Sequence, residues 1–168
     1  MQITIDQTWD GSPVSASEQV FIQLTRGPKH LRMECDAPFY GDPAPSGPAG
    51  PYWKLWEHEV VELFVLGPEE TYTEIEVGPH GHHLVLQLAG RRQVLARELP
   101  LELTIKHTQQ RWTAVAELPL VFLPPTPWRG NAYAIHGLGA KRRFLAGWPV
   151  PGPHPDFHRL EHFRPLLL

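Results

Sequence analysis

The sequence has a single cysteine, Cys35, and no strong excess of charge of either sign. One cysteine cannot form a disulfide within the chain, so a disulfide-stapled scaffold is excluded. Fifteen Lys and Arg oppose 18 Asp and Glu, which gives a formal net charge of -3. This balance lacks the basic face that contacts with nucleic-acid phosphates or anionic membranes require. We therefore expect neither a nucleic-acid partner nor a membrane partner.

Long hydrophobic runs and targeting signals are also missing. No stretch approaches the ~20 apolar residues of a transmembrane helix. The first residues, MQITID, contain neither the basic region nor the apolar run of a signal peptide. The cytoplasm is therefore the expected location.

The sequence contains no complete catalytic motif. We find no GxSxG, HExxH, GxGxxG, phosphate-binding loop, EF-hand loop or CxxC. No catalytic residue is assigned, and no cofactor is required by the sequence.

Proline and glycine are abundant, with 19 and 14 residues scattered along the chain. They leave little room for long helices, whereas several of the short segments between them alternate with period two. The prediction is an all-β protein, an antiparallel β-sandwich with long Pro/Gly-rich loops and at most one or two short helices. We expect residues 1–168 to form a single domain, because its length suits one core. The expected strands span residues 21–24, 31–35, 60–66, 72–77, 82–88, 94–99, 101–106, 112–118 and 131–136.

Two segments, 36–52 and 147–158, predict long irregular loops because each is rich in proline and glycine. Loops of this length inside a compact domain are either functional or mobile. The first is also a candidate for docking a partner protein, which would make the chain a protein-interaction domain.

Glutamates gather on two expected neighbouring strands. Glu59 and Glu62 belong to the first, and Glu74 and Glu76 to the second. Such carboxylates can accept sugar hydroxyls, bind Ca²⁺ or act as general acid and base, or they can form a solvated strand face. Glu62 is embedded among apolar residues and so requires a partner or a cavity. We expect that partner to be His136 or an arginine.

Histidine is frequent, with ten residues in the chain. His80, His82 and His83 crowd one turn, and with Glu74 or Glu76 they are candidates for a divalent metal site. The spacing matches no known ligand motif, and His82 and His83 should point to opposite faces of a strand. Metal binding is therefore left open. His136 ends an expected strand, where it is either a ligand-binding residue or a partly buried, hydrogen-bonded core residue.

Aromatic and basic residues lie in or near the long loops. Trp53, Trp56 and Trp148 can stack on sugar rings, although tryptophan more often packs on a core. Arg142, within the basic run at 141–143, can hold an anionic or polyhydroxyl ligand by forked hydrogen bonds, or it can simply face solvent.

Five segments together show a family resemblance: TWDGSPV (8–14), LWEHEVVELFV (55–65), YTEIEVGPHGHHLVL (72–86), AIHG (134–137) and PDFHRLEHF (155–163). In this order the chain resembles, over nearly its whole length, the uncharacterised protein family of the chromosome 4 open reading frame 33 type. That family implies no activity. More distantly, residues 53–86 and PDFHRLEHF resemble the family-nine carbohydrate-binding modules and their DOMON-like relatives, which implies a β-sandwich that binds sugars or haem. We find no matching haem ligands.

The expected function is non-catalytic binding of a small ligand, a sugar or another polyhydroxyl compound, in a pocket with tryptophans at its rim and carboxyl and imidazole groups on its floor. The alternatives are a metal-assisted or carboxylate-pair hydrolase acting on a sugar derivative, and a protein-interaction domain. The predicted ligand-binding residues are Trp53, Trp56, Glu59, Glu62, Tyr72, Glu74, Glu76, His80, His83, His136, Arg142, Trp148 and His158.

Overall fold

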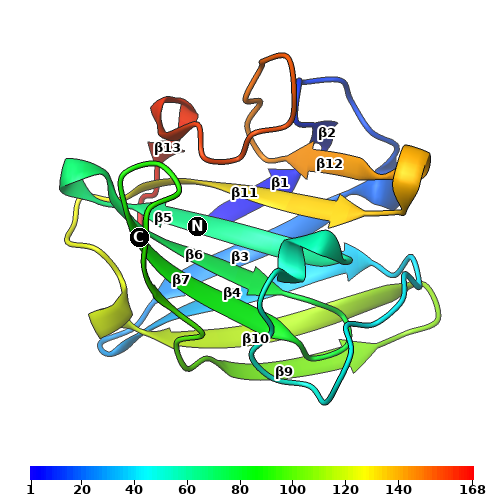
Figure 1. Cartoon of the computed structure of the whole chain (residues 1–168), viewed down its shortest axis with the longest axis horizontal. Coiled ribbons are helices and arrows are strands. Elements are labelled where there is room, and N and C mark those ends of the chain that lie inside the picture. Colours follow the sequence, from blue (N-terminus) through cyan, green and yellow to red (C-terminus); the bar gives the residue numbers. More distant parts are fainter.

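Two antiparallel β-sheets pack face to face in the computed structural model, which describes residues 1–168. In Figure 1, β5, β6 and β7 of the larger sheet lie in front of β3 and β4 of the smaller one. The smaller sheet has five strands in the order β1-β3-β4-β10-β9. The larger has eight, seven of them in the order β2-β12-β11-β5-β6-β7-β8, with β13 paired to β11. The predicted β-sandwich is confirmed.

The strands of the smaller sheet are β1 (Gln2–Ile5), β3 (Val20–Arg26), β4 (His30–Pro38), β9 (Glu102–His107) and β10 (Arg111–Pro119). Those of the larger sheet are β2 (Gln7–Thr8), β5 (Val60–Leu66), β6 (Thr71–Val77), β7 (His83–Ala89), β8 (Val94–Arg97), β11 (Arg129–His136), β12 (Arg143–Ala146) and β13 (Arg164–Pro165). The helical segments are three-residue 3-10 turns: η1 (Ala16–Glu18), η2 (Leu55–Glu57), η3 (Pro68–Glu70), η4 (Leu120–Phe122), η5 (Gly139–Lys141) and η6 (Leu160–His162).

The main core lies between the sheets and is built by strand alternation. Leu24, Met33 and Trp112 from the smaller sheet meet Leu63 and Ile75 from the larger one in a single buried cluster. Each of these positions is followed by a side chain on the opposite face, as the period of two requires. Nearly every strand of the sandwich therefore places one face in this core.

A second buried cluster covers the outer face of the larger sheet, and this cluster makes room for the site. Phe64, Tyr72 and Leu86 on that face pack against Phe157 and Phe163 from the segment after β12. All seven residues of β5 are buried, because its two faces belong to the two different clusters. The nearly continuous apolar run at 60–66 in the sequence matches this burial on both sides.

The sequence located nine of the strands within a few residues but missed β1, β2, β12 and β13. Each of these has four residues or fewer, which is too short for a period of two to stand out. None of the helical turns has the length and hydropathy needed to cross a membrane.

Candidate functional site

Three glutamates from two neighbouring strands meet on the outer face of the larger sheet. We call Glu62 on β5, with Glu74 and Glu76 on β6, the glutamate cluster. Antiparallel pairing sets Glu62 opposite Glu76, and Glu74 lies two residues away on the same face. One carboxyl oxygen from each residue lies within 4.8 Å of the others. The side chains are 2%, 3% and 0% exposed, respectively.

Burial dominates the electrostatics of the glutamate cluster. It raises the pKa of Glu62 and Glu76 well above the usual range, and the neighbouring carboxyls raise both further. Burial also raises the pKa of Glu74 to about 7, an increase that its contact with Glu76 and the charge of Arg92 partly offset. The cluster therefore keeps protons at pH values where an ordinary glutamate is ionised, and those protons can be donated to a ligand.

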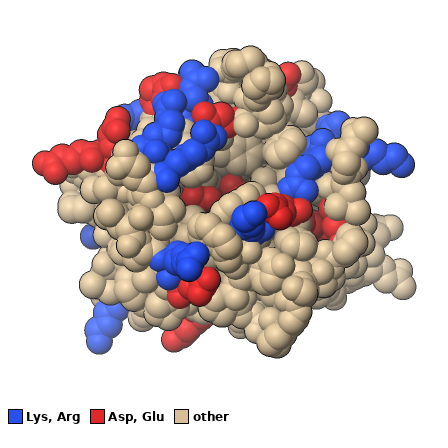
Figure 2. Space-filling model, in the orientation of Figure 1, with Lys and Arg blue, Asp and Glu red and all other residues tan.

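A pocket of about 510 Å³ opens above the glutamate cluster. Glu62 and Glu74 contribute to its floor, and most of its remaining lining is apolar or aromatic. Figure 2 shows this hollow on the face of the molecule, with acidic atoms at its bottom and basic side chains along its rim. The lining residues are Trp53, Trp56, Glu62, Phe64, Glu74, Leu86, Leu88, Arg92, Val94, Ile135, Phe144, Pro155, Phe157 and His158.

One side of the pocket is fixed by a partly buried hydrogen bond between His158 and Tyr72. The Tyr72 hydroxyl lies 2.8 Å from Nδ1 of His158 and also accepts the backbone N–H of Arg92 at 3.0 Å. Burial lowers the pKa of His158 to about 4, so the imidazole is neutral at neutral pH. Its ring packs edge-on against Phe64. The irregular segment after β12 is thereby tied to the sheet.

Arg142 lies outside the pocket lining but positions one of its walls. Its guanidinium donates to the backbone carbonyl of Glu57 at 2.8 Å and to that of Trp56. These carbonyls belong to the turn η2, which presents Trp56 to the pocket, and Trp53 packs edge-on against Trp56. The arginine expected beside Glu62 therefore acts on it through its charge, which lowers the Glu62 pKa, while its hydrogen bonds go to η2.

The predicted grouping of His136 with Glu62 and Glu74 is wrong. In the register of β11 with β5, Tyr133 pairs with Glu62 and Ala134 with Val61, so His136 projects on the opposite face from the glutamate cluster. There it stacks on Tyr40 at 3.5 Å between ring centroids. Glu59 lies in the same region and accepts the backbone N–H groups of Tyr40 and Asp42. These two residues hold the 36–52 segment and are outside the pocket.

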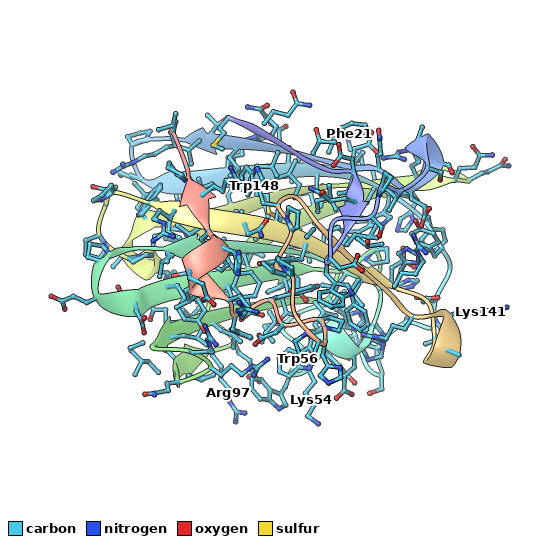
Figure 3. All side chains as sticks on the ribbon, turned by 90° about the horizontal axis from the view of Figure 1, so that it is seen from above. Phe21, Lys54, Trp56, Arg97, Lys141 and Trp148 are labelled. Carbon is cyan, nitrogen blue, oxygen red and sulfur yellow. The ribbon has the colours of Figure 1, made fainter.

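His80, His83 and Trp148 also lie away from the glutamate cluster. His80 contacts the carbonyl of Asp42, and His83 pairs with Val77, whose side chain belongs to the main core. Trp148 packs against that same core, and Figure 3 shows it well separated from Trp56. The histidines form no ligand group with the glutamates, because the three glutamates are the only potential metal-ligand group in the chain.

The structure therefore brings together Trp53, Trp56, Glu62, Glu74 and His158 around the pocket, with Tyr72 and Glu76 directly behind its wall and floor. Ligand binding by these residues stays a prediction.

Sequence reasoning missed the apolar half of the pocket lining. Phe64 was identifiable, since it alternates in phase with Glu62 along β5. Phe144, Phe157 and Arg92 come from a short strand and two loops, whose placement no periodicity indicates.

Solved structures share this fold. The crystal structure of a proposed carbohydrate-binding protein from Bacteroides uniformis superposes with a TM-score of 0.77 at 14% identity, covering 98% of this chain and 84% of that one. A family 9 carbohydrate-binding module from Caldicellulosiruptor kristjanssonii, solved with cellotriose, gives a TM-score of 0.51 at 12% identity, over 80% of this chain and 68% of that one. The chain is thus a β-sandwich of the architecture that these two proteins have.

Full-length relatives identify the family. The human UPF0462 protein C4orf33 is 45% identical over 98% of this chain and 86% of its own length. The rat homolog is 46% identical over 99% of this chain and 87% of its own length, and the zebrafish homolog 42% identical over 100% and 89%. The chain belongs to the UPF0462 protein C4orf33 family. No family model matches it.

Proposed function

We propose that this protein binds a small sugar or another polyhydroxyl compound in the pocket above the glutamate cluster, without catalysing a reaction on it. The main observation in support of this proposal is the combination of unpaired buried oxygens on the floor with aromatic side chains on the walls. Glu62 and Glu74 each keep one buried oxygen without a hydrogen-bond partner. Native proteins rarely leave such atoms unpaired, so a ligand's hydroxyls are natural partners.

The size and lining of the pocket support this proposal. A volume of about 510 Å³ lies in the range typical of small-molecule sites, where a few polar groups sit in an apolar lining. Trp53 and Trp56 stand at the edge of the pocket, where an indole face can pack on the apolar face of a sugar ring. Protonated carboxyls can donate to ligand oxygens while ionised ones accept from hydroxyls.

The proposal is tested by thermal shift with a library of monosaccharides and disaccharides. A ligand present at 100 times its dissociation constant stabilises the folded state by about 2.7 kcal/mol, which is readily measured. We expect at least one sugar to raise the melting temperature, and Trp56→Ala to abolish that shift. Phe21→Ala is the matched control, because Phe21 is an exposed aromatic residue of β3 in the other sheet. A library without a stabilising sugar would contradict the proposal.

A carboxylate-pair hydrolase is the second candidate, favoured by the short distances within the glutamate cluster. Retaining glycosidases place two carboxyl groups about 5–5.5 Å apart and raise the pKa of one of them. Here burial raises the pKa of all three glutamates, so none is set aside as the ionised nucleophile. Release of nitrophenol from aryl glycosides by the wild type, lost in Glu62→Gln, would replace the binding proposal with this one.

A further inference from the structure

The glutamate cluster has no positive counter-charge bonded to it. Four of its carboxyl oxygens, one each on Glu62 and Glu74 and both on Glu76, are buried without a bonded cation, and Glu74 and Glu76 contact each other. The two guanidinium groups whose charges reach the cluster are bonded elsewhere: Arg142 to backbone carbonyls of η2, and Arg92 to Asp156 at 2.8 Å. Three carboxyls sharing one buried site are costly to ionise without a cation among them.

We propose that the ligand of this pocket carries a protonated primary amine, and that the ammonium group binds on the glutamate cluster while the rest of the ligand packs against the aromatic walls. This inference rests on the proposed binding function and narrows its ligand class to amino sugars and similarly compact hydroxylated amines.

The geometry of the cluster matches an ammonium group. A primary ammonium has three N–H donors, and charge-assisted bonds of about 2.8 Å in tetrahedral directions put their acceptors about 4.6 Å apart. One oxygen from each of the three glutamates lies within 4.8 Å of the others. An ammonium group on the floor can therefore donate to Glu62 and Glu74, which line the pocket, with the Glu76 carboxyl within 4.8 Å of theirs.

Glu76 gives independent support, since it lies beneath the pocket floor. Glu76 is 0% exposed, it does not line the cavity, and no positively charged group is bonded to it. A ligand hydroxyl that remains at the pocket surface is satisfied by Glu62 and Glu74 alone. A third buried carboxyl within 4.8 Å of those two adds negative charge when it ionises, which favours a cation over a neutral ligand.

The aromatic walls favour an organic cation over a metal ion. Trp56, Phe144 and Phe157 line the same cavity, and aromatic faces attract cations. Calcium and magnesium are held by a shell of oxygen ligands that includes waters, whereas most of the lining above the floor is apolar. The cavity of about 510 Å³ also accommodates a whole sugar ring beyond the ammonium group.

Binding of an ammonium group must release protons from the glutamate cluster. Affinity therefore rises with pH as long as the amine keeps its own proton, and calorimetry in buffers of different ionisation enthalpy measures the protons released. The titratable and charged groups that face or influence the cluster are Glu62, Glu74, Glu76, Tyr72, Arg92, Arg142, Tyr133, Asp156 and His158. This proton release distinguishes ammonium binding from the binding of a neutral sugar, which does not require the glutamates to ionise.

The experiment compares three ligand sets by calorimetry at pH 7: glucosamine, galactosamine and mannosamine, their parent hexoses, and their N-acetyl forms. We expect at least one hexosamine to bind tenfold or more tightly than its hexose and its N-acetyl form. Glu76→Gln should lower that hexosamine-to-hexose preference about tenfold. Glu102→Gln on β9 of the other sheet removes the same charge at an exposed position and should leave the preference unchanged.

The possible results separate this inference from the function on which it rests. Equal binding of hexosamine, hexose and N-acetyl form would overturn the ammonium inference and leave sugar binding standing. Binding of no ligand in the three sets would overturn both. A rise in melting temperature with CaCl₂ or MnCl₂ alone, lost in Glu76→Gln, would make the cluster a metal site and overturn the inference. If Glu76→Gln does not fold, the wild-type comparison of hexosamine with its N-acetyl form still decides.

Discussion

Neighbouring side chains of β5 and β11 lie in different environments, depending on which face of the strand they occupy. Glu62 and Val61 are adjacent, yet Val61 is in the main core and Glu62 beneath the pocket. Asn131 on β11 is buried but fully hydrogen-bonded. Its amide donates to the Tyr133 hydroxyl and the Trp148 carbonyl, and its oxygen accepts the Trp148 N–H. A buried polar residue with all of these partners anchors the segment after β12.

Glu74 should make the stability of the protein depend on pH. Its pKa rises from the ordinary 4.5 to about 7 on folding, chiefly through burial. The folded state thus holds the proton more tightly than the unfolded state. The stabilising contribution is fully present below pH 4.5 and is lost as the pH rises through about 7, a change of about 3 kcal/mol.

Glu74→Gln cannot ionise. Between pH 4.5 and pH 8, the free energy of unfolding of this variant should therefore rise by about 3 kcal/mol relative to that of the wild type. Urea denaturation at several pH values measures this difference. Buried histidines such as His158, whose pKa burial lowers to about 4, oppose the trend in absolute stability but act in both proteins alike. A difference that does not change with pH would show that Glu74 is ionised in the folded state.

At the scale of elements, the segment between β12 and β13 closes one side of the pocket. It is held to the β7–β8 turn by two exposed ion pairs, Arg92 with Asp156 and Arg91 with Glu161, each at 2.8 Å. Exposed pairs contribute little to global stability, typically 0.2–1 kcal/mol. Their effect should therefore appear in local opening of this segment.

Arg92→Ala should lower the global free energy of unfolding by about 1 kcal/mol or less but speed amide hydrogen exchange across residues 152–162. Exchange followed by mass spectrometry measures the effect. Arg32→Ala is the control, because Arg32 makes comparable exposed pairs with Glu34 and Glu117 on the other sheet. Equal exchange in both variants would mean that the buried contacts of Phe157 and Leu160 alone hold the segment.

At the scale of the whole molecule, the larger sheet is buried on both faces but by different kinds of packing. Leu63 lies in the main core between the sheets and is 0% exposed. Leu86 belongs to the outer cluster and lines the pocket. Leu63 is therefore surrounded by packed side chains, whereas Leu86 borders the open pocket.

Leu63→Ala should lower the free energy of unfolding by an amount in the upper part of the 2–5 kcal/mol range for buried leucines, because a new cavity forms between the sheets. Leu86→Ala should cost about 2 kcal/mol or less, since it enlarges an existing pocket. Urea denaturation monitored by circular dichroism compares the two. Equal costs would indicate that the outer cluster collapses around Leu86 in solution and that the pocket is closed there.

Local sequence patterns were enough to predict nine strands and which of their residues share a face. The alternation of Tyr72, Glu74 and Glu76 against Thr73, Ile75 and Val77 depends only on the period of a strand, and the apolar neighbours of Glu62 required its burial. The tertiary structure decided which residues meet. A one-residue difference in register would move His136 to the face of the glutamate cluster, and register depends on pairing between strands about 70 residues apart. The cover of the pocket likewise depends on where Phe157 and His158 dock, because an irregular segment carries no periodic signal that fixes its position.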